Sequence, residues 1–244
     1  MKTGIYEFAG QVVEITSLFD GIHTLCQNYA SEKAPDFRIR TTEADIAFEQ
    51  EKSDREAEIE GIRKQKFSDE YLETLAVYRK IAGEMLSRST LLMHGSTIAV
   101  DGEGYLFTAK SGTGKSTHTR FWRDTFGDRA MMVNDDKPLL RITPQETRVY
   151  GTPWDGKHHL STNTSVPLTA ICILERGEQN EITRIDPGTV LPMLLQQCHR
   201  PRDPRSLAQV LMLLDTMTKN VRFYRLRCNL DPDAARVAFE GMQE

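Results

Sequence analysis

Residues 109–117 read AKSGTGKST, and this short glycine-rich segment constrains the fold more than any other part of the chain. It follows the apolar stretch 105–108 and precedes residues 115–126, which can form a helix. A strand, a glycine-rich loop and a helix in this order are the context in which backbone N–H groups cradle phosphate. The segment therefore predicts an α/β domain built around a phosphate-binding loop, or P-loop.

Each residue type in the loop suits a phosphate ligand. Glycines permit the backbone torsions that turn successive N–H groups inward, and the helix N-terminus adds a partial positive charge. Lys115 supplies a charge for the β- and γ-phosphates, the Ser116 hydroxyl suits Mg²⁺, and Thr117 is expected near the α-phosphate. The predicted nucleotide-binding residues are Ser111, Gly112, Thr113, Gly114, Lys115, Ser116 and Thr117.

One position departs from the full pattern, which has a glycine where Ala109 stands. Alanine is the smallest replacement, so we expect the loop to tolerate it. The alternative interpretation is a Gly/Ser turn that happens to contain a lysine. The strand before the loop and the helix after it argue against that alternative.

A pair of acidic residues, Asp135 and Asp136, ends the next predicted strand, residues 130–133. Ligands of open α/β sheets bind at the carboxyl ends of the strands. One carboxylate there is suited to hold Mg²⁺, and the other to accept a proton from an attacking hydroxyl. The alternative is a plain polar turn, Asn-Asp-Asp-Lys-Pro. Beside a P-loop, the pair favours a phosphotransfer site.

The ordered set LLMHGSTIAVDGEGYLFTAKSGTGKST…AMMVNDDKPLL resembles the catalytic core of HPr kinase/phosphorylase. That family shares its P-loop architecture with ATP-dependent phosphoenolpyruvate carboxykinase, and the resemblance covers residues 91–142. It implies an α/β P-loop core with a mixed sheet. It also implies that His94 lies near the γ-phosphate, that Asp135 transfers the proton, and that Asp136 assists with metal or geometry. For His94, a polar residue at a strand end is an equal alternative.

The departures from that family bear on the substrate. The Glu–Arg signature that follows the acidic strand in HPr kinases is not found, and GTPWDGK, residues 151–157, stands in its place. The upstream residues do not resemble the N-terminal domain of those enzymes. The chain is also too short for a carboxykinase. The resemblance is therefore to an HPr-kinase-like protein and not to a true HPr kinase.

Several lesser features are candidates for the same site. In residues 151–157, Trp154 offers a stacking face, and Asp155 or Lys157 could reach metal or phosphate; an ordinary tight turn is the alternative. The pair His158-His159 is not interpreted as a metal site, because adjacent strand residues face opposite ways.

Histidine and arginine side chains supply further candidates. His118, on the first turn of the P-loop helix, contacts a ligand or is a solvated helix residue. The arginines that could bind transferred phosphate or an acidic acceptor are Arg176, Arg200, Arg202 and Arg205. For the last three, a solvated surface loop is the preferred interpretation.

The rest of the chain predicts mixed α/β structure in two parts, a small β-rich extension over residues 1–66 and a P-loop core over residues 67–244. Strand-like patterns occupy residues 5–15 and 36–48, and residues 49–66 form a charged connector or exposed helix. Ser68 is expected to cap a helix over 69–86. Residues 101–104 link a hairpin. The later elements expected are strands over 138–142, 147–150, 168–175, 180–185 and 221–227, and helices over 188–198 and 204–218.

Composition excludes several classes of protein. With 31 Lys and Arg against 35 Asp and Glu, the net charge is −4, which argues against a dedicated nucleic-acid binder. No apolar run approaches the roughly 20 residues that cross a bilayer, and no secretory signal is recognised. The four cysteines are scattered, as in proteins of a reducing cytosol. We therefore expect a cytoplasmic protein that binds neither membrane nor nucleic acid.

The sequence predicts an ATP- and Mg²⁺-dependent kinase that moves the γ-phosphate to a hydroxyl of an unidentified protein, peptide or small-molecule acceptor. Asp135, Lys115 and His94 are the predicted catalytic residues, and Ser116 and Asp136 the predicted metal ligands. GTP in place of ATP stays open, because base contacts lie outside the P-loop. A nucleotide-hydrolysing switch and a non-catalytic nucleotide-binding accessory protein stay open as alternatives. The resemblance suggests a homo-oligomer.

Overall fold

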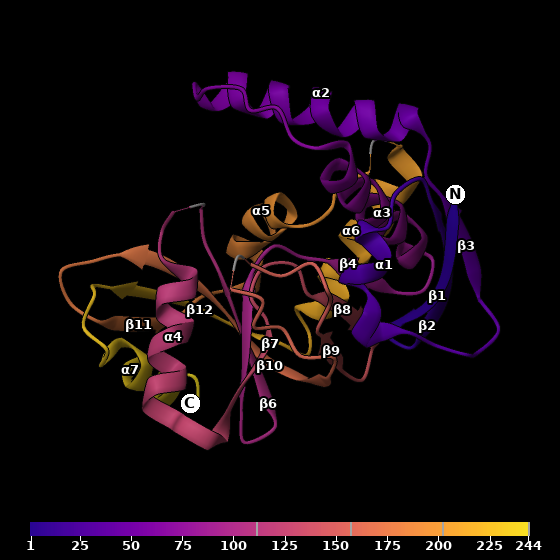
Figure 1. The fold of residues 1–244 in the computed structure, drawn as a ribbon. Coiled ribbons are helices and arrows are strands. Elements are labelled where there is room, and N and C mark those ends of the chain that lie inside the picture. The colour runs from indigo at the N-terminus through magenta and orange to yellow at the C-terminus, as the bar shows by residue number, and fades with distance from the viewer. Residues whose placement is uncertain (111, 157, 202, 244) are drawn as a thin grey trace. The chain divides into compact units, whose positions relative to one another are not determined.

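The computed structural model describes residues 1–110, 112–156, 158–201 and 203–243. The fold is mixed α/β, as expected, and it divides into two compact units, Met1–Glu84 and Met85–Glu244 (Figure 1). The boundary predicted near residue 67 lies at the start of helix α3 (Asp69–Leu86), whereas the compact units divide near the end of that helix.

The first unit contains a three-stranded sheet in the order β1-β2-β3. β1 and β2 form an antiparallel hairpin, and β3 runs parallel to β2. Its other elements are short helices and two long ones. The bounds are β1 (Lys2–Phe8), β2 (Gln11–Ser17), α1 (Gly21–Leu25), η1 (Gln27–Tyr29), β3 (Phe37–Arg40) and α2 (Glu43–Glu60), followed by α3.

The strand pattern predicted over residues 36–48 is wrong in its second half. β3 ends at Arg40 and α2 begins at Glu43, so Ile46 and Phe48 lie on a helix. The cause is a capping box: the Thr42 N–H donates to the Asp45 carboxylate at 3.0 Å, while the Asp45 N–H donates to the Thr42 carbonyl. This cap overrides the alternation of apolar residues, and the charged segment after it is helical to Glu60.

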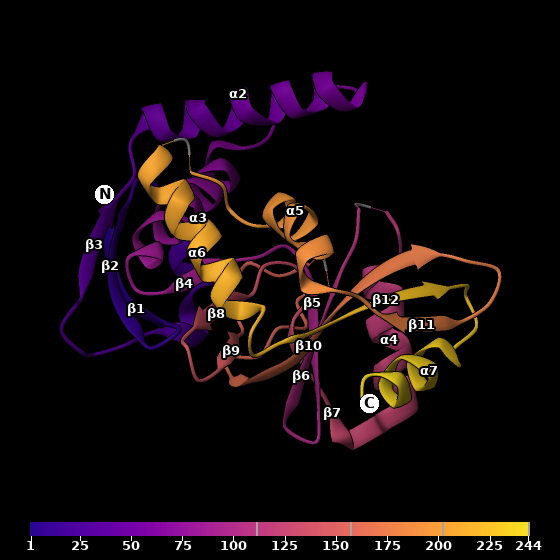
Figure 2. The same ribbon diagram turned by 180° about the vertical axis from the view of Figure 1, so that it is seen from behind.

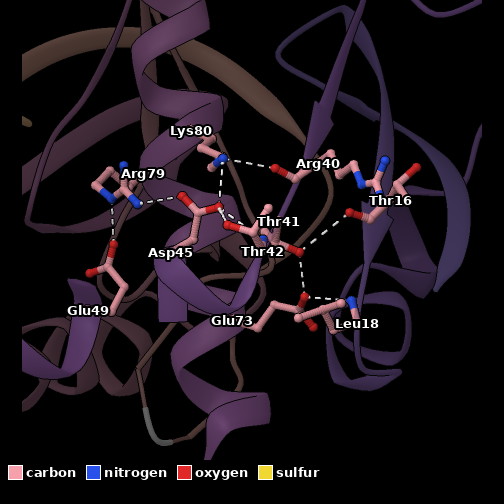
Figure 3. Close-up of polar contacts among 10 residues, drawn as sticks. All are labelled: Thr16, Leu18, Arg40, Thr41, Thr42, Asp45, Glu49, Glu73, Arg79 and Lys80. Atoms are coloured by element: carbon pink, nitrogen blue, oxygen red, sulfur yellow. Dashed lines mark hydrogen bonds and ion pairs between the residues drawn. The ribbon is translucent and has the colours of Figure 1, made fainter. Parts of the chain in front are cut away.

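A buried carboxylate organises the first unit (Figure 3). Glu73, on α3, is 1% exposed, and it accepts hydrogen bonds from the N–H groups of Leu18 at 2.7 Å and Phe19 at 2.8 Å. The hydroxyl of Thr41 donates to the same carboxylate. These bonds join α3 to the ends of β2 and β3, because the donors lie just beyond those strands.

The second unit is built on a nine-stranded mixed sheet. Its path runs β4-β8-β9-β10-β6-β5-β7, and β12 pairs with both β10 and β11. The central strands β6, β10 and β12 are parallel. The bounds are β4 (Thr90–Leu92), β5 (Ser96–Val100), β6 (Glu103–Thr108), β7 (Ala130–Asn134), β8 (Leu139–Ile142), β9 (Thr147–Tyr150), β10 (Ser165–Arg176), β11 (Glu181–Arg184) and β12 (Arg222–Cys228).

Helices cover both faces of this sheet, and side chains alternate between two apolar clusters. On β6, Leu106 belongs to one cluster, while Tyr105 and Phe107 belong to the other. The first cluster packs under α5 (Pro187–Gln197) and α6 (Pro204–Met217). The second packs under α4 (Lys115–Phe126) and α7 (Ala234–Gly241), which lie side by side (Figure 2). Central strands buried on both faces are typical of such three-layer folds.

The helices and the hairpin predicted in this part of the sequence are confirmed. The Tyr71 N–H donates to the Ser68 hydroxyl at 3.3 Å at the start of α3, and β5 pairs antiparallel with β6 across residues 101–102. α4 begins at Lys115, so the strand, loop and helix predicted around residues 109–117 are present. No helix among the described residues is long and apolar enough to cross a membrane.

Candidate functional site

The glycine-rich loop connects the end of β6 to the start of α4. Gly112 and Gly114 have φ angles of 75° and 119°, in the region that favours glycine. A Cβ built on either residue would meet no atom within 4 Å, so the concave side of the loop is open. Ala109 is buried in the apolar cluster under α4, and its small side chain fits where the full pattern has glycine.

Two basic residues hold the loop in place. The Nζ atom of Lys115 lies 3.4 Å from the carbonyl oxygen of Ala109. The guanidinium of Arg176, at the end of β10, donates to the carbonyl oxygen of Gly112 at 2.9 Å. Burial lowers the pKa of Lys115, and the nearby charges of Asp136 and Asp135 oppose that effect. An anion bound at the loop would favour the charged form of this lysine.

The acidic pair follows β7 and is shaped by Asn134. The Oδ1 atom of Asn134 accepts hydrogen bonds from the N–H groups of Asp136 at 2.9 Å and Lys137 at 2.6 Å. Its amide group donates to the carbonyl and the hydroxyl of Thr152. These hydrogen bonds of the Asn134 side chain close a turn at the end of β7. The turn fixes the positions of the two aspartates beyond the edge of the sheet.

The two carboxylates have different surroundings. Asp135 is 4% exposed, and the hydroxyl of Ser96 lies 2.9 Å from its Oδ1 atom. Its other oxygen, Oδ2, has no hydrogen-bond partner among the described residues and lies 2.7 Å from a Cβ built on Gly156. The carboxylate of Asp135 is therefore oriented from one side only.

The carboxylate of Asp136 lies between two basic side chains. Its Oδ1 atom lies 3.2 Å from Nε2 of His94, and its Oδ2 atom lies 3.2 Å from Nζ of Lys137. Burial acts to raise the pKa of Asp136, but the hydrogen bond with His94 and the charge of Lys137 outweigh it, so the pKa lies below its ordinary value. Asp136 is therefore an anion at neutral pH.

Loop and acidic pair face one cavity of about 730 Å³, a size within the usual range for small-molecule sites. Its walls combine the glycine-rich loop, the first turns of α4 and the turn after β7 with Gly156, His158 and Leu160. The lining residues are His94, Gly112, Gly114, Lys115, Ser116, Thr117, Arg120, Arg123, Asp135, Asp136, Gly156, His158 and Leu160. Groups suited to phosphate, to metal and to proton transfer thus share one space.

Comparison with known proteins assigns the family. The profile of the family described as "SynChlorMet cassette protein ScmC" matches residues 62–233. The chain belongs to the ScmC family. No curated protein matches the sequence. Among solved structures, the HPr(Ser) kinase/phosphatase from Coxiella burnetii is similar at 12% identity and a TM-score of 0.34, over 63% of this chain and 99% of that one. We take no residue role from this weak likeness.

In this ScmC chain, eight of the predicted site residues line the cavity together: His94, Gly112, Gly114, Lys115, Ser116, Thr117, Asp135 and Asp136. Thr113 differs, because its hydroxyl turns back to donate to the carbonyl oxygen of Lys110 at 2.8 Å. Ser111 lies outside the described residues. His94 follows the end of β4, as the strand-end interpretation expects, and it also lines the cavity; its predicted place near a γ-phosphate stays a prediction.

His118 and Trp154 do not reach the cavity. His118 is 3% exposed, and its Nε2 atom accepts a hydrogen bond from Nε1 of Trp122 at 3.0 Å. Both predicted roles, ligand contact and solvated helix residue, are therefore wrong: burial lowers the pKa of His118 to about 3 and makes it a neutral core residue. Trp154 is also buried, so its ring offers no open stacking face.

The remaining predicted candidates lie apart from the cavity lining of the ScmC chain. Asp155 pairs with His159 at 3.0 Å and accepts a hydrogen bond from the Ser161 N–H. Arg200 and Arg205 are exposed and precede or begin α6. Lys157 and Arg202 lie outside the described residues.

Sequence reasoning missed Arg120 and Arg123, which line the cavity from α4. A signal for them was present, because Ser116, Arg120 and Arg123 follow the i, i+4, i+7 spacing of one helix stripe. The serine at the start of that stripe belongs to the phosphate loop. Following the same side of the helix from Ser116 towards its C-terminus would have predicted both arginines as candidate site residues.

The donor set fits a nucleotide with Mg²⁺. The open glycine cradle and Lys115 suit a triphosphate, and the oxygens of Ser116 and Asp136 suit a hard cation. No group of three His, Cys, Asp or Glu side chains in the described part of the chain is placed to hold a metal ion.

Proposed function

We propose that this chain is a Mg²⁺-dependent phosphotransferase that moves the γ-phosphate of ATP to a hydroxyl of an acceptor. One observation carries the proposal: a single cavity has the glycine loop, Lys115 and Ser116 on one wall and Asp135 with Asp136 on another. Phosphoryl transfer needs positioning and charge stabilisation on the donor side and a proton acceptor on the other side. The cavity contains side chains of each kind.

On the donor side, the loop N–H groups and Lys115 bind the triphosphate. Ser116 and Asp136 would hold Mg²⁺, which neutralises charge on the β- and γ-phosphates when bound. His94 and Lys137 keep Asp136 ionised and in place through the contacts at 3.2 Å. Lys115 stabilises the charge that develops on the leaving ADP.

On the acceptor side, Asp135 acts as the general base. Ser96 fixes its Oδ1 atom, and its Oδ2 atom accepts the proton of the acceptor hydroxyl. As that O–H bond breaks, the acceptor oxygen forms a bond to the γ-phosphorus. The bond between the γ-phosphorus and the β,γ-bridging oxygen breaks, and ADP departs with the electron pair.

The acceptor is a separate question. The family description names its members as proteins of a cassette, so the other products of that cassette are the first acceptors to test. Water as the acceptor would make the protein a hydrolase with the same residues in the same roles.

The test is Asp135→Asn, with Asp128→Asn as the matched control, because Asp128 is an exposed residue outside the cavity. We expect the wild type to form ADP slowly from Mg·ATP with water as a poor acceptor. Asp135→Asn should bind nucleotide with unchanged affinity and lose at least 100-fold in ADP formation, the usual contribution of a general base. ADP formation that is equal in the wild type and Asp135→Asn would contradict the proposal and favour a non-catalytic nucleotide-binding protein.

A further inference from the structure

The cavity extends beyond the phosphate loop along the outer stripe of α4. Ser116, Arg120 and Arg123 are spaced i, i+4 and i+7, so they share one side of the helix, and all three line the cavity. At 1.5 Å per residue, the backbone of Arg123 lies about 10 Å along the axis from that of Ser116. The cavity lining therefore extends along α4 beyond the glycine-rich loop, and we call the part lined by Arg120 and Arg123 the second arm.

Arg123 lacks a partner in this arm. Its Nε atom is buried and has no hydrogen-bond acceptor among the described residues. A buried donor without an acceptor costs about 1–3 kcal/mol, so such groups are normally satisfied by protein, water or ligand. Arg123 also lines the cavity, so its guanidinium group lies where a ligand could supply an acceptor.

Arg120, one turn earlier, is also without an acidic partner. Its guanidinium carbon lies 5.6 Å from the ring centroid of Phe121, and it forms no ion pair within the described part of the chain. Some other arginines of this unit are engaged by acidic side chains: Arg129 pairs with Asp101, and Arg236 pairs with Asp233 and Glu240. Two guanidinium groups on the cavity wall thus retain their full capacity for an oxyanion.

Three further lining residues extend the same cavity next to Asp135, the proposed general base. Gly156, His158 and Leu160 line the same cavity, and a Cβ on Gly156 would lie 2.7 Å from Oδ2 of Asp135. An acceptor hydroxyl that gives its proton to Oδ2 must occupy this side. Because Arg120 and Arg123 line the same cavity as Asp135, a ligand that occupies it could contact all three residues.

We propose that Arg120 and Arg123 form a second anion subsite, which binds a phosphate or carboxylate group of the acceptor. The planar guanidinium group matches both oxyanions through paired N–H···O bonds. This inference rests on the proposed function, because it names the class of acceptor: a hydroxyl compound, or a peptide segment, that also carries an oxyanion. The subsite selects the acceptor, whereas the phosphate loop selects the nucleotide.

The test titrates inorganic phosphate into the full chain saturated with Mg·AMP-PNP, at constant ionic strength, followed by calorimetry. With the loop occupied, we expect the wild type to bind one further phosphate. Arg123→Met keeps the apolar stem and should weaken that binding at least tenfold. Arg123→Lys should restore part of it. Arg129→Met is the matched control, outside the cavity, and should leave phosphate affinity unchanged.

Two results would overturn the subsite. One is phosphate affinity that is the same in Arg123→Met and wild type. The other is a wild type that binds phosphate only when nucleotide is absent, which would assign the arginines to the nucleotide itself. The Lys115→Ala variant separates the claims: without nucleotide, it should still bind phosphate through Arg120 and Arg123. Failure of Mg·AMP-PNP to bind would contradict the proposed function, while phosphate binding by Lys115→Ala would still support the subsite.

Discussion

The Nε2 atom of His94 lies 3.2 Å from the Oδ1 atom of Asp136, and this contact joins the two sequence segments that flank the glycine-rich loop. The Nδ1 atom of His94 lies 3.1 Å from Oε1 of Gln197, at the end of α5. Both ring nitrogens therefore face oxygen atoms, which fixes the orientation of the imidazole. Asp136 in turn is held at the cavity wall, where we propose that it binds Mg²⁺.

Asp136 makes the stability of the protein depend on pH. Its folded-state pKa is below the value of about 3.9 expected in the unfolded chain, so its contacts contribute stability above that value and lose it as the pH falls through the folded pKa. Asp136→Asn should therefore be less stable than wild type at pH 7, and the difference should shrink towards pH 3. Urea unfolding at pH 7, 5 and 3 measures it. A difference in unfolding free energy that is the same at pH 7, 5 and 3 would contradict the claim that the contacts of ionised Asp136 stabilise the fold.

His118 gives a second pH effect, in a higher range. The native state holds this histidine neutral down to a pKa of about 3, whereas the unfolded chain takes up a proton below about pH 6.5. Stability should therefore fall by about 1.4 kcal/mol per pH unit between about pH 6 and pH 4 from this residue alone. His118→Gln retains an acceptor for Trp122 but does not titrate. Its free energy of unfolding should decline less steeply across that range, and an unchanged slope would remove His118 as the cause.

Gly156 tests how tightly the general base is positioned. A methyl group at this position would lie 2.7 Å from Oδ2 of Asp135, so the carboxylate must shift. Gly156→Ala should lower ADP formation at least tenfold, since small displacements of a reacting group cost large factors in rate. The affinity for Mg·AMP-PNP should stay within a factor of two, because Gly156 is not among the residues proposed to bind the triphosphate. ADP formation at the wild-type rate in Gly156→Ala would contradict the claim that catalysis requires the present position of the Asp135 Oδ2 atom.

Glu73 tests the account of the first unit (Figure 3). Glu73→Ala leaves the N–H groups of Leu18 and Phe19 and the Thr41 hydroxyl without their acceptor in a buried site, at a cost of about 3 kcal/mol or more in unfolding free energy. Hydrogen exchange should lose protection first at those two amides. Glu51→Ala, on the exposed side of α2, should change stability by less than about 0.5 kcal/mol. Full protection of both amides in Glu73→Ala would contradict the role of the Glu73 carboxylate as their hydrogen-bond acceptor.

Much of the second unit could be predicted from the sequence because its signals are local. The glycine-rich segment at 109–114 placed β6 and α4 on either side of it, and the apolar residues around 101–104 placed the hairpin of β5 and β6. The first unit was harder. Ile46 and Phe48 alternate as in a strand, and only the interaction between Thr42 and Asp45 shows that a helix begins there.

The limits at the site have a different cause. Composition cannot show which polar residues are buried: His118 and Trp154 resemble site residues in the sequence but pack into the core. Conversely, Arg120 and Arg123 resemble ordinary solvated helix residues, and only the cavity shows that they face the same space as Lys115. The direction in which a side chain points depends on tertiary packing, which a single sequence does not give.

The central claim is that residues 109–117 bind the phosphates of a nucleotide with Mg²⁺ in the cavity that also holds the acidic pair. The most direct test is a calorimetric titration of Mg·AMP-PNP into wild type, Lys115→Ala and the control Lys52→Ala, whose lysine lies on exposed α2. We predict saturable binding to the wild type and to Lys52→Ala, with affinity at least tenfold weaker in Lys115→Ala. Binding that is equal in all three proteins, or no binding to the wild type, would contradict the account.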